Sequence, residues 1–149
     1  MAESATPEVW YEANCHCAAI KYKVKLPSLD SLEIMICNCS ICTKNGYFNV
    51  YPKRTDLVYI QGEDSVKGYL FGKKAHMHKF CPTCGSSLFV EPEMDDVEGM
   101  ALNVILLIIF CAWRFADTVK VRMIKDIDLD MLKYKKFDGK TKLQPPYNP

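Results

Sequence analysis

The chain has 149 residues, 49% of them hydrophobic, and its 19 Lys and Arg residues nearly balance 18 Asp and Glu residues. A chain of this length forms one domain with enough apolar material for a core. The even charge argues against a nucleic-acid-binding protein, because those proteins carry a clustered excess of basic residues. Residues 1–10 have neither the basic start nor the apolar run of a secretory leader, so we expect a cytoplasmic protein.

Most of the chain alternates apolar and polar residues with a period of two, which is typical of half-buried antiparallel strands. The clearest case runs from Ile20 to Leu26, where lysines alternate with large apolar side chains. Gly, Pro and Asn residues separate the alternating stretches. Short strands are predicted at residues 20–26, 32–37, 47–51, 57–61, 65–71, 77–80 and 86–90. The sequence therefore predicts an all-β, single-domain fold of antiparallel strands.

Three further stretches set the expected limits of the domain. Residues 99–113 carry no charge and are almost wholly apolar. They are fewer than the roughly 20 residues that a membrane-spanning helix needs, so we expect a buried strand or helix and no membrane span. Residues 1–13 and 139–149 are expected to be flexible, which leaves a folded domain at residues 14–138.

Seven of the eight cysteines fall into three tight groups. Cysteines two or three residues apart on a turn can point their sulfurs at one tetrahedral zinc ion. Disulfides are disfavoured, because neighbouring side chains on a strand point to opposite faces and no leader directs the chain to an oxidising compartment. The groups are Cys15 with Cys17, Cys37 with Cys39 and Cys42, and Cys81 with Cys84.

The number of sulfurs in each group predicts two different metal sites. Two pairs, which we call the outer tetrad (Cys15, Cys17, Cys81 and Cys84), can complete a four-sulfur shell. The middle group, which we call the cysteine trio (Cys37, Cys39 and Cys42), leaves a fourth position open. A zinc ion with four protein ligands is normally structural, whereas one with three can bind water or a substrate thiolate. We therefore expect two zinc ions, one structural and one reactive.

The order of these motifs resembles the glutathione-dependent formaldehyde-activating enzyme family, which also includes centromere protein V. The motifs are Cys-His-Cys from residue 15, Cys-Asn-Cys-Ser-Ile-Cys from residue 37 and Phe-Cys-Pro-Thr-Cys-Gly from residue 80. The resemblance implies packed antiparallel sheets with a zinc knuckle, a structural zinc on the outer tetrad and a catalytic zinc on the trio. It also implies a carbon-sulfur lyase that interconverts glutathione plus formaldehyde with S-(hydroxymethyl)glutathione. The alternative is a non-catalytic zinc-bound binding module of the centromere protein V type.

Further expectations concern the residues near the metal ligands. Glutathione carries two carboxylates, and Lys44, which follows the trio, is the best candidate to bind one. The fourth position of the reactive zinc can be filled by water, by substrate, or by His76 or His78. The family usually has glycine where this chain has Ala18, and alanine is tolerable there only if the backbone keeps a negative φ. The partners expected are a thiol and an aldehyde, and the oligomeric state stays open.

Residues 105–121 are a possible insertion. Relatives in the family commonly run straight from a strand like residues 101–104 into a segment like residues 122–128. The intervening stretch is apolar and has no turn residues at its joins, unlike a surface loop. It is either a translated intron in the gene model or a genuine variation of the family. We expect it to be dispensable, because it contains none of the seven clustered cysteines.

Overall fold

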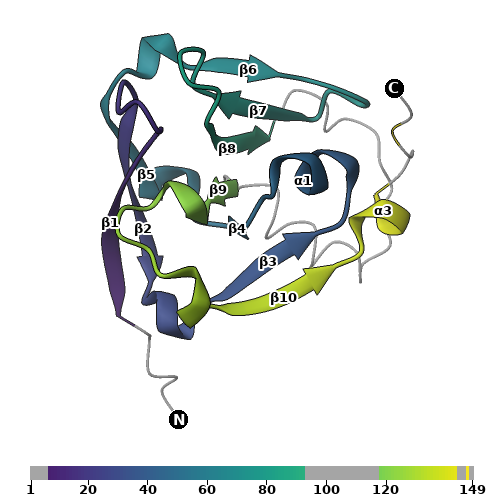
Figure 1. Ribbon diagram of the computed structural model, residues 1–149, viewed down its shortest axis with the longest axis horizontal. Coiled ribbons are helices and arrows are strands. Elements are labelled where there is room, and N and C mark those ends of the chain that lie inside the picture. Colours follow the sequence, from purple (N-terminus) through teal and green to yellow (C-terminus); the bar gives the residue numbers. More distant parts are fainter. Residues whose placement is uncertain (1–6, 93–117, 144–146, 148–149) are drawn as a thin grey trace.

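The computed structural model describes residues 7–92, 118–143 and 147 (Figure 1). These residues form two sheets, one with the strand order β1-β2-β5 and one with the order β10-β3-β4-β9-β8-β7-β6. The strands of the small sheet are β1 (Glu8–Asn14), β2 (Lys21–Pro27) and β5 (Leu57–Gln61). Those of the large sheet are β3 (Glu33–Cys37), β4 (Asn49–Val50), β6 (Lys67–Tyr69), β7 (His76–Phe80), β8 (Ser87–Pro92), β9 (Thr118–Lys120) and β10 (Lys133–Phe137).

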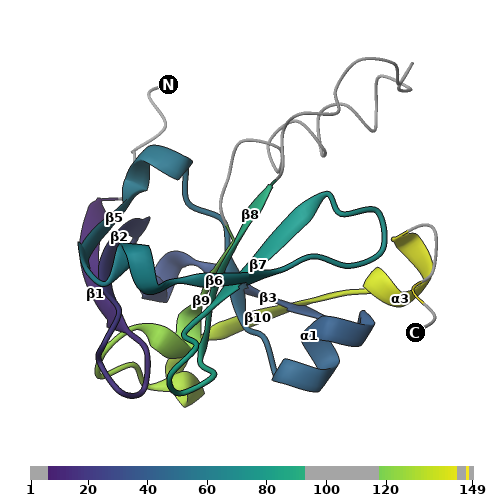
Figure 2. The same cartoon turned by 90° about the horizontal axis from the view of Figure 1, so that it is seen from above.

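Short helical segments connect the strands. Two are α-helical, α1 (Ser40–Asn45) and α3 (Gly139–Lys142). Turns of 3-10 helix lie at Leu29–Ser31, Arg54–Asp56, Glu63–Ser65, Val121–Met123 and Leu129–Met131. The small sheet lies at one end of the molecule, and α1 and α3 lie at the other (Figure 2). No helix in the described ranges has the length and apolar character needed to cross a membrane.

The core forms where the small sheet packs against the large one. The predicted alternation in β2 is confirmed, because Tyr22, Val24 and Leu26 are buried and the lysines between them are only partly so. Tyr22 meets Phe89 of β8 edge to face, with ring centroids 5.6 Å apart, and its hydroxyl donates to the Leu88 carbonyl at 3.4 Å. Such aromatic pairs stabilise beyond the area they bury. This contact fixes β8, which follows the second half of the outer tetrad.

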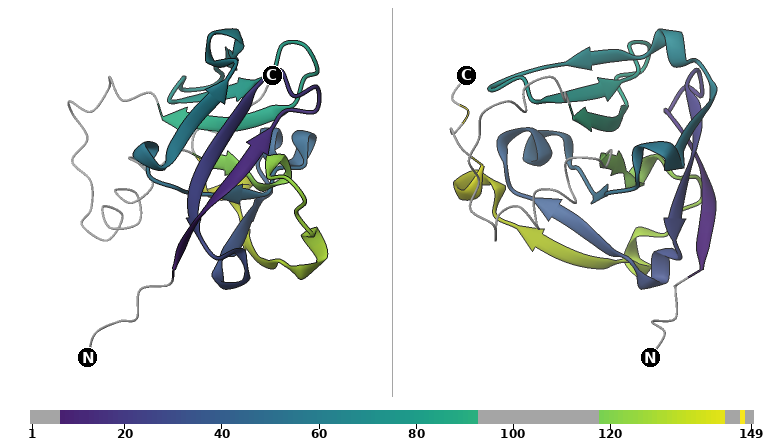
Figure 3. Two further views of the ribbon diagram at one scale, coloured as in Figure 1. Left: turned by 90° about the vertical axis from the view of Figure 1, so that its left-hand side faces the viewer. Right: turned by 180° about the vertical axis from the view of Figure 1, so that it is seen from behind.

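The prediction of an all-β fold is confirmed. One feature of it, a parallel strand pair, could not be predicted from the period-two pattern. Strand β10 pairs with β3 in parallel, and Phe137 lies opposite Cys37. The other strand pairs are antiparallel. The parallel pair brings the C-terminal segment to the first cysteine of the trio. Figures 1 and 3 show the consequence, with α3 lying beside α1 in views from opposite sides.

Parts of both ends that were expected to be flexible form regular secondary structure. Residues 8–13 belong to β1, which pairs with β2 along its whole length and is further tied by the Lys25–Glu8 ion pair at 2.7 Å. At the other end, residues 139–142 form α3, in which Gly139 is buried. The first segment pairs with β2, and the second packs against the trio.

Residues 118–120, near the end of the possible insertion, form a strand inside the large sheet, and Val121 begins the 3-10 turn that follows. Strand β9 pairs with β4 on one side and with β8 on the other, and Val119 and Val121 are fully buried. Residues 118–121, at the end of the possible insertion, therefore belong to the folded core. Residues 105–117, and the apolar stretch at 99–113, lie outside the described residues.

Candidate metal centres

Two turns bring the four sulfurs of the outer tetrad together. In one, the Cys15 amide donates to the Ile20 carbonyl at 3.1 Å. In the other, which joins β7 to β8, the Gly85 amide donates to the Cys81 carbonyl at 2.8 Å and Gly85 adopts a φ of 74°. Glycine suits that turn because it has no Cβ to strain a positive φ. The four Sγ atoms all lie within 4.8 Å of one another, as the sequence predicted.

The spacing of these sulfurs fits a tetrahedral zinc site. Four sulfurs at a Zn–S distance of about 2.3 Å lie roughly 3.8 Å apart. The Sγ atom of Cys17 is 3.6 Å from that of Cys15 and 3.8 Å from that of Cys81. Cys15 and Cys81 are fully buried, and all seven described cysteines are free thiols. The outer tetrad can therefore hold a metal ion.

Ala18 adopts a left-handed backbone conformation, which the sequence did not predict. Its φ is 59°, in the left-handed region, because the turn must bring Cys15 and Cys17 to one point before β2 begins. A non-glycine residue in this region costs about 1–2 kcal/mol, since its Cβ crowds the following carbonyl. The condition that Ala18 keeps a negative φ is therefore not met, and the turn carries local strain.

The cysteine trio spans the junction between β3 and α1. Cys37 is the last residue of β3, Cys39 is the extended residue just before α1, and Cys42 lies within the helix. A left-handed Gly46 ends the helix, and the amides of Gly46 and Tyr47 both donate to the Cys42 carbonyl. This compact turn places the three Sγ atoms within 4.8 Å of one another.

The trio has the chemistry of a metal site with an open position. Hydrogen bonds with Cys37 and Cys42 lower the pKa of Cys39 to about 2, and the same cluster raises the pKa of Cys42. The group therefore stabilises at least one thiolate, which is the form that binds metal. Within the described ranges, no His, Asp or Glu joins these three sulfurs, so His76 and His78 are not brought into the group.

The C-terminal segment packs directly against the trio. The Asn38 side chain donates to Asp138 Oδ1 and accepts from the Lys140 amide, both at 2.8 Å. A Cβ atom at position 139 would overlap Cys37 Sγ and lie 3.2 Å from Cys39 Cβ, so this close approach requires Gly139. Asn38 thus lies between two cysteines of the trio and fixes α3 beside them.

Buried polar residues that sequence reasoning missed lie on the other side of the trio. Asn49 is 2% exposed, with Nδ2 3.9 Å from Cys42 Sγ and Oδ1 accepting from Lys120 Nζ at 2.7 Å. Lys120 Nζ also lies 3.7 Å from the centre of the Tyr47 ring. Burial lowers the pKa of Lys120 to about 7, and the three cysteines oppose that shift. No alternation pattern predicts a buried Asn or Lys, because polar strand residues normally face solvent.

The trio's cysteine motif, the outer tetrad and most of the core lie within one family match. The chain matches the sequence profile described as glutathione-dependent formaldehyde-activating enzyme over residues 10–108. It belongs to this family. The description names the enzyme and not centromere protein V. The match includes all seven clustered cysteines and ends before β9, so Lys120, Arg122 and α3 lie beyond it.

A solved structure supports the same fold. The chain is 20% identical to a Rhodobacter sphaeroides protein whose crystal structure comes from a structural genomics programme. The TM-score is 0.63, and the match covers 83% of this chain and 99% of that one. At this identity the similarity establishes the fold alone. No curated protein matches the chain.

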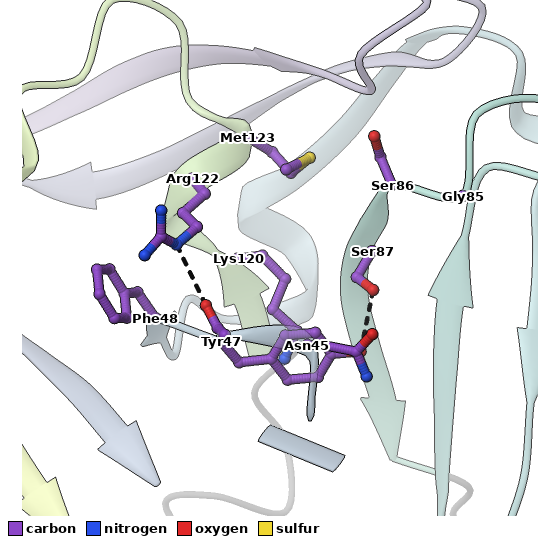
Figure 4. Close-up of a pocket in the computed structure, with 10 residues that line it drawn as sticks. Asn45, Tyr47, Phe48, Gly85, Ser86, Ser87, Lys120, Arg122 and Met123 are labelled. Atoms are coloured by element: carbon purple, nitrogen blue, oxygen red, sulfur yellow. Dashed lines mark hydrogen bonds between the residues drawn. The ribbon is translucent and has the colours of Figure 1, made fainter. Parts of the chain in front are cut away.

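Two cavities lie between the end of α1 and the start of β8, and Figure 4 shows the larger. The larger has a volume of about 250 Å³ and the smaller about 150 Å³. Both are lined by Asn45, Tyr47, Gly85 and Ser87, and the Tyr47 hydroxyl donates to Ser87 Oγ at 3.1 Å. Tyr47 is buried, and it also forms part of the wall of both cavities.

Lys44 and the two histidines occupy different settings. Lys44 is exposed in the last turn of α1, which also holds Cys42. His78 lines the smaller cavity, and burial lowers its pKa to about 4, so it is neutral at pH 7. Its Nδ1 atom is buried and has no hydrogen-bond partner among the described residues.

Proposed function

We propose that this protein is a zinc-dependent carbon-sulfur lyase that joins a thiol such as glutathione to formaldehyde or a similar aldehyde. The observation that carries the proposal is the trio of clustered sulfurs with no fourth protein donor among the described residues, in a member of this family. A purely structural zinc site would be completed by the protein. An incomplete one leaves room for a substrate sulfur.

The two metal sites have separate roles in this proposal. The outer tetrad holds a structural zinc ion and ties the first turn of the chain to the β7–β8 turn, 64 residues apart at Cys17 and Cys81. The trio holds the catalytic zinc ion, which when bound would supply an electrophilic site where a thiol loses its proton. Three thiolates give such a site a formal charge of about −1, which favours exchange of soft sulfur ligands over activation of water.

The protein's own residues position the reactants. The reaction forms one S–C bond, breaks the π bond of the aldehyde C=O, and moves the thiol proton to the resulting oxygen. It requires no oxidant or reductant. Because thiols add readily to formaldehyde, holding the two reactants together supplies most of the acceleration needed. Asn49 and Gly139 pack against the trio, and in this proposal the substrate approaches it from the cavity lined by Ile41 and His78.

Lys44 is proposed to bind one carboxylate of the thiol substrate. It lies in the same helix as Cys42, and its ammonium group is exposed to solvent. An exposed pair of this kind is weak, because water screens both charges. Lys44 therefore contributes modest affinity to the proposed substrate complex.

The proposal is tested by following exchange between glutathione, formaldehyde and S-(hydroxymethyl)glutathione by NMR, using zinc-loaded protein. We expect wild-type protein to exceed the uncatalysed exchange rate and Cys39→Ser to lose that acceleration, since the trio would retain only two sulfurs. Cys111→Ser is the matched control, because Cys111 lies outside the three cysteine groups. A binding module without catalysis would bind zinc but leave the exchange at its uncatalysed rate. That result, or full activity of Cys39→Ser, would contradict the proposal.

A further inference from the structure

The charges of the residues that line the two cavities favour binding of an anion. Their lining residues include no Asp or Glu, and Lys120 and Arg122 both line the larger one. Tyr47, Ser86 and Ser87, which carry hydroxyl groups, line the same cavity (Figure 4). A carboxylate accepts hydrogen bonds from cations and hydroxyls and is repelled by acidic neighbours. The larger cavity therefore suits a small molecule with a carboxylate group.

Arg122 is the cation in this cavity that is best placed to bind a carboxylate. Its Nε donates to the Gly46 carbonyl at 3.2 Å, and its guanidinium carbon lies 4.2 Å from the centre of the Phe48 ring. These two contacts hold the guanidinium plane in one orientation and use only one of its five N–H donors. In the described part of the chain no carboxylate pairs with it. A fixed guanidinium with free donors can bind a carboxylate through two parallel hydrogen bonds.

The cavities are linked to the trio through the end of α1. Arg122 is bonded to the carbonyl of Gly46, whose own amide donates to the Cys42 carbonyl. The smaller cavity is lined by Ile41, the residue before Cys42, and by His78. The two cavities share four lining residues and so adjoin as one groove, whose lining extends from Arg122 to Ile41 of α1.

We infer that Arg122 binds a carboxylate of the thiol substrate and so makes the enzyme selective for acidic thiols. This inference rests on the proposed function. A thiol peptide lying in the groove places its carboxylate at Arg122 and its sulfur at the trio. The guanidinium recognises the charge and planar shape of the carboxylate and does not contact the reacting atoms. Its role is therefore substrate selection.

The experiment compares two thiols that differ only in their carboxylates, glutathione and its diethyl ester. Binding of each to zinc-loaded protein is measured by isothermal titration calorimetry, and conversion of each with formaldehyde is followed by NMR. Arg122→Gln is expected to raise the Kd for glutathione about tenfold, the loss of one paired charge, and to leave the Kd for the ester unchanged. Arg122→Lys is expected to lose less affinity for glutathione, because lysine keeps the positive charge but cannot form two parallel hydrogen bonds.

Arg54→Gln is the matched control, since Arg54 lies in the 3-10 turn before β5 and lines neither cavity. It should bind both thiols as wild type does. Zinc content and thermal unfolding establish that each variant is folded. Unchanged glutathione binding in Arg122→Gln, or equal weakening of glutathione and ester, would overturn the inference while wild-type conversion still supports the proposed function. If wild-type protein converts neither thiol, the proposed function fails and this inference fails with it.

Discussion

The side chain of Asn38 donates a hydrogen bond to Asp138 across 100 residues of sequence, at a distance of 2.8 Å. Asn38 stands between the first two cysteines of the trio, and Asp138 immediately precedes α3. The parallel pairing of β10 with β3 makes this contact possible, because it delivers the C-terminal segment to the end of β3. The trio is therefore held in shape by both halves of the chain.

Asn38→Ala should weaken zinc binding at the trio and leave the outer tetrad unaffected. The lost hydrogen bonds go to the C-terminal turn and not to a sulfur, so we expect less than the ~10-fold loss that follows removal of a ligand's own hydrogen-bond partner. Competition with a chelator measures both zinc affinities in one sample, and the tetrad is the internal control. Unchanged release of the more labile zinc would show that the Asn38 contacts do not support the trio.

Ala18→Gly should stabilise the protein by about 1 kcal/mol. Glycine relieves the strain of a φ of 59°, and this gain exceeds the added freedom of the unfolded chain. Thermal or denaturant unfolding of the zinc-loaded protein measures the change. As a control, Ala13→Gly should lower the stability of the protein, because Ala13 is a buried residue of the paired strand β1. A loss of stability in Ala18→Gly would mean that residue 18 does not adopt a left-handed conformation.

The strands and the metal groups follow from local sequence, and the surroundings of the trio do not. Alternation with a period of two predicts β2, β3, β5, β7 and β8, because one face of each is buried. Cysteine spacing predicts both sulfur groups, because ligands two or three residues apart need only a turn to converge. The six-residue helix α1 was not predicted, because it is too short to show the apolar periodicity of an amphipathic helix. It forms between an extended Cys39 and a left-handed Gly46.

Strand pairing and polar burial depend on contacts between distant segments. The parallel pair β10–β3 has no signature in either strand alone, so the position of Asp138 and Gly139 beside the trio could not be predicted. Asn49 and Lys120 are buried because each satisfies the other near the cysteine cluster. A polar residue gives no hint of such a partner 71 residues away. The residues that surround the trio could therefore be identified only from the structure.

Lys44→Ala should raise the KM for glutathione less than about fivefold and spare kcat. The small effect follows from the exposure of Lys44, since water screens an exposed ion pair. Lys53→Ala, which removes another exposed lysine outside both cavities, serves as the control. Steady-state kinetics with glutathione and formaldehyde separate the two constants. An unchanged KM would mean that Lys44 is a solvated surface residue with no part in binding.

Deleting residues 105–121 should yield a folded protein that still binds zinc at both sites. The deletion joins Val104 to Arg122, so residues 101–104 take the positions of residues 118–121. Leu102 and Val104 then replace the buried Val119 and Val121 with apolar side chains of similar size. Zinc content and unfolding temperature of the shortened protein test this. Aggregation or loss of zinc would show that residues 118–121 cannot be replaced, and transcript sequencing across this region decides whether the segment is a retained intron.

The central claim, that the outer tetrad is structural and the trio is reactive, is tested most directly by counting zinc per chain in wild-type protein, Cys81→Ser and Cys39→Ser. Zinc bound to a structural site contributes its binding energy to folding. We expect about two zinc ions in the wild type, an unfolded or severely destabilised Cys81→Ser, and a folded Cys39→Ser with about one zinc. Circular dichroism on the same samples reports the fold. A wild-type count of one zinc, or equal loss of fold in both variants, would contradict this division of roles.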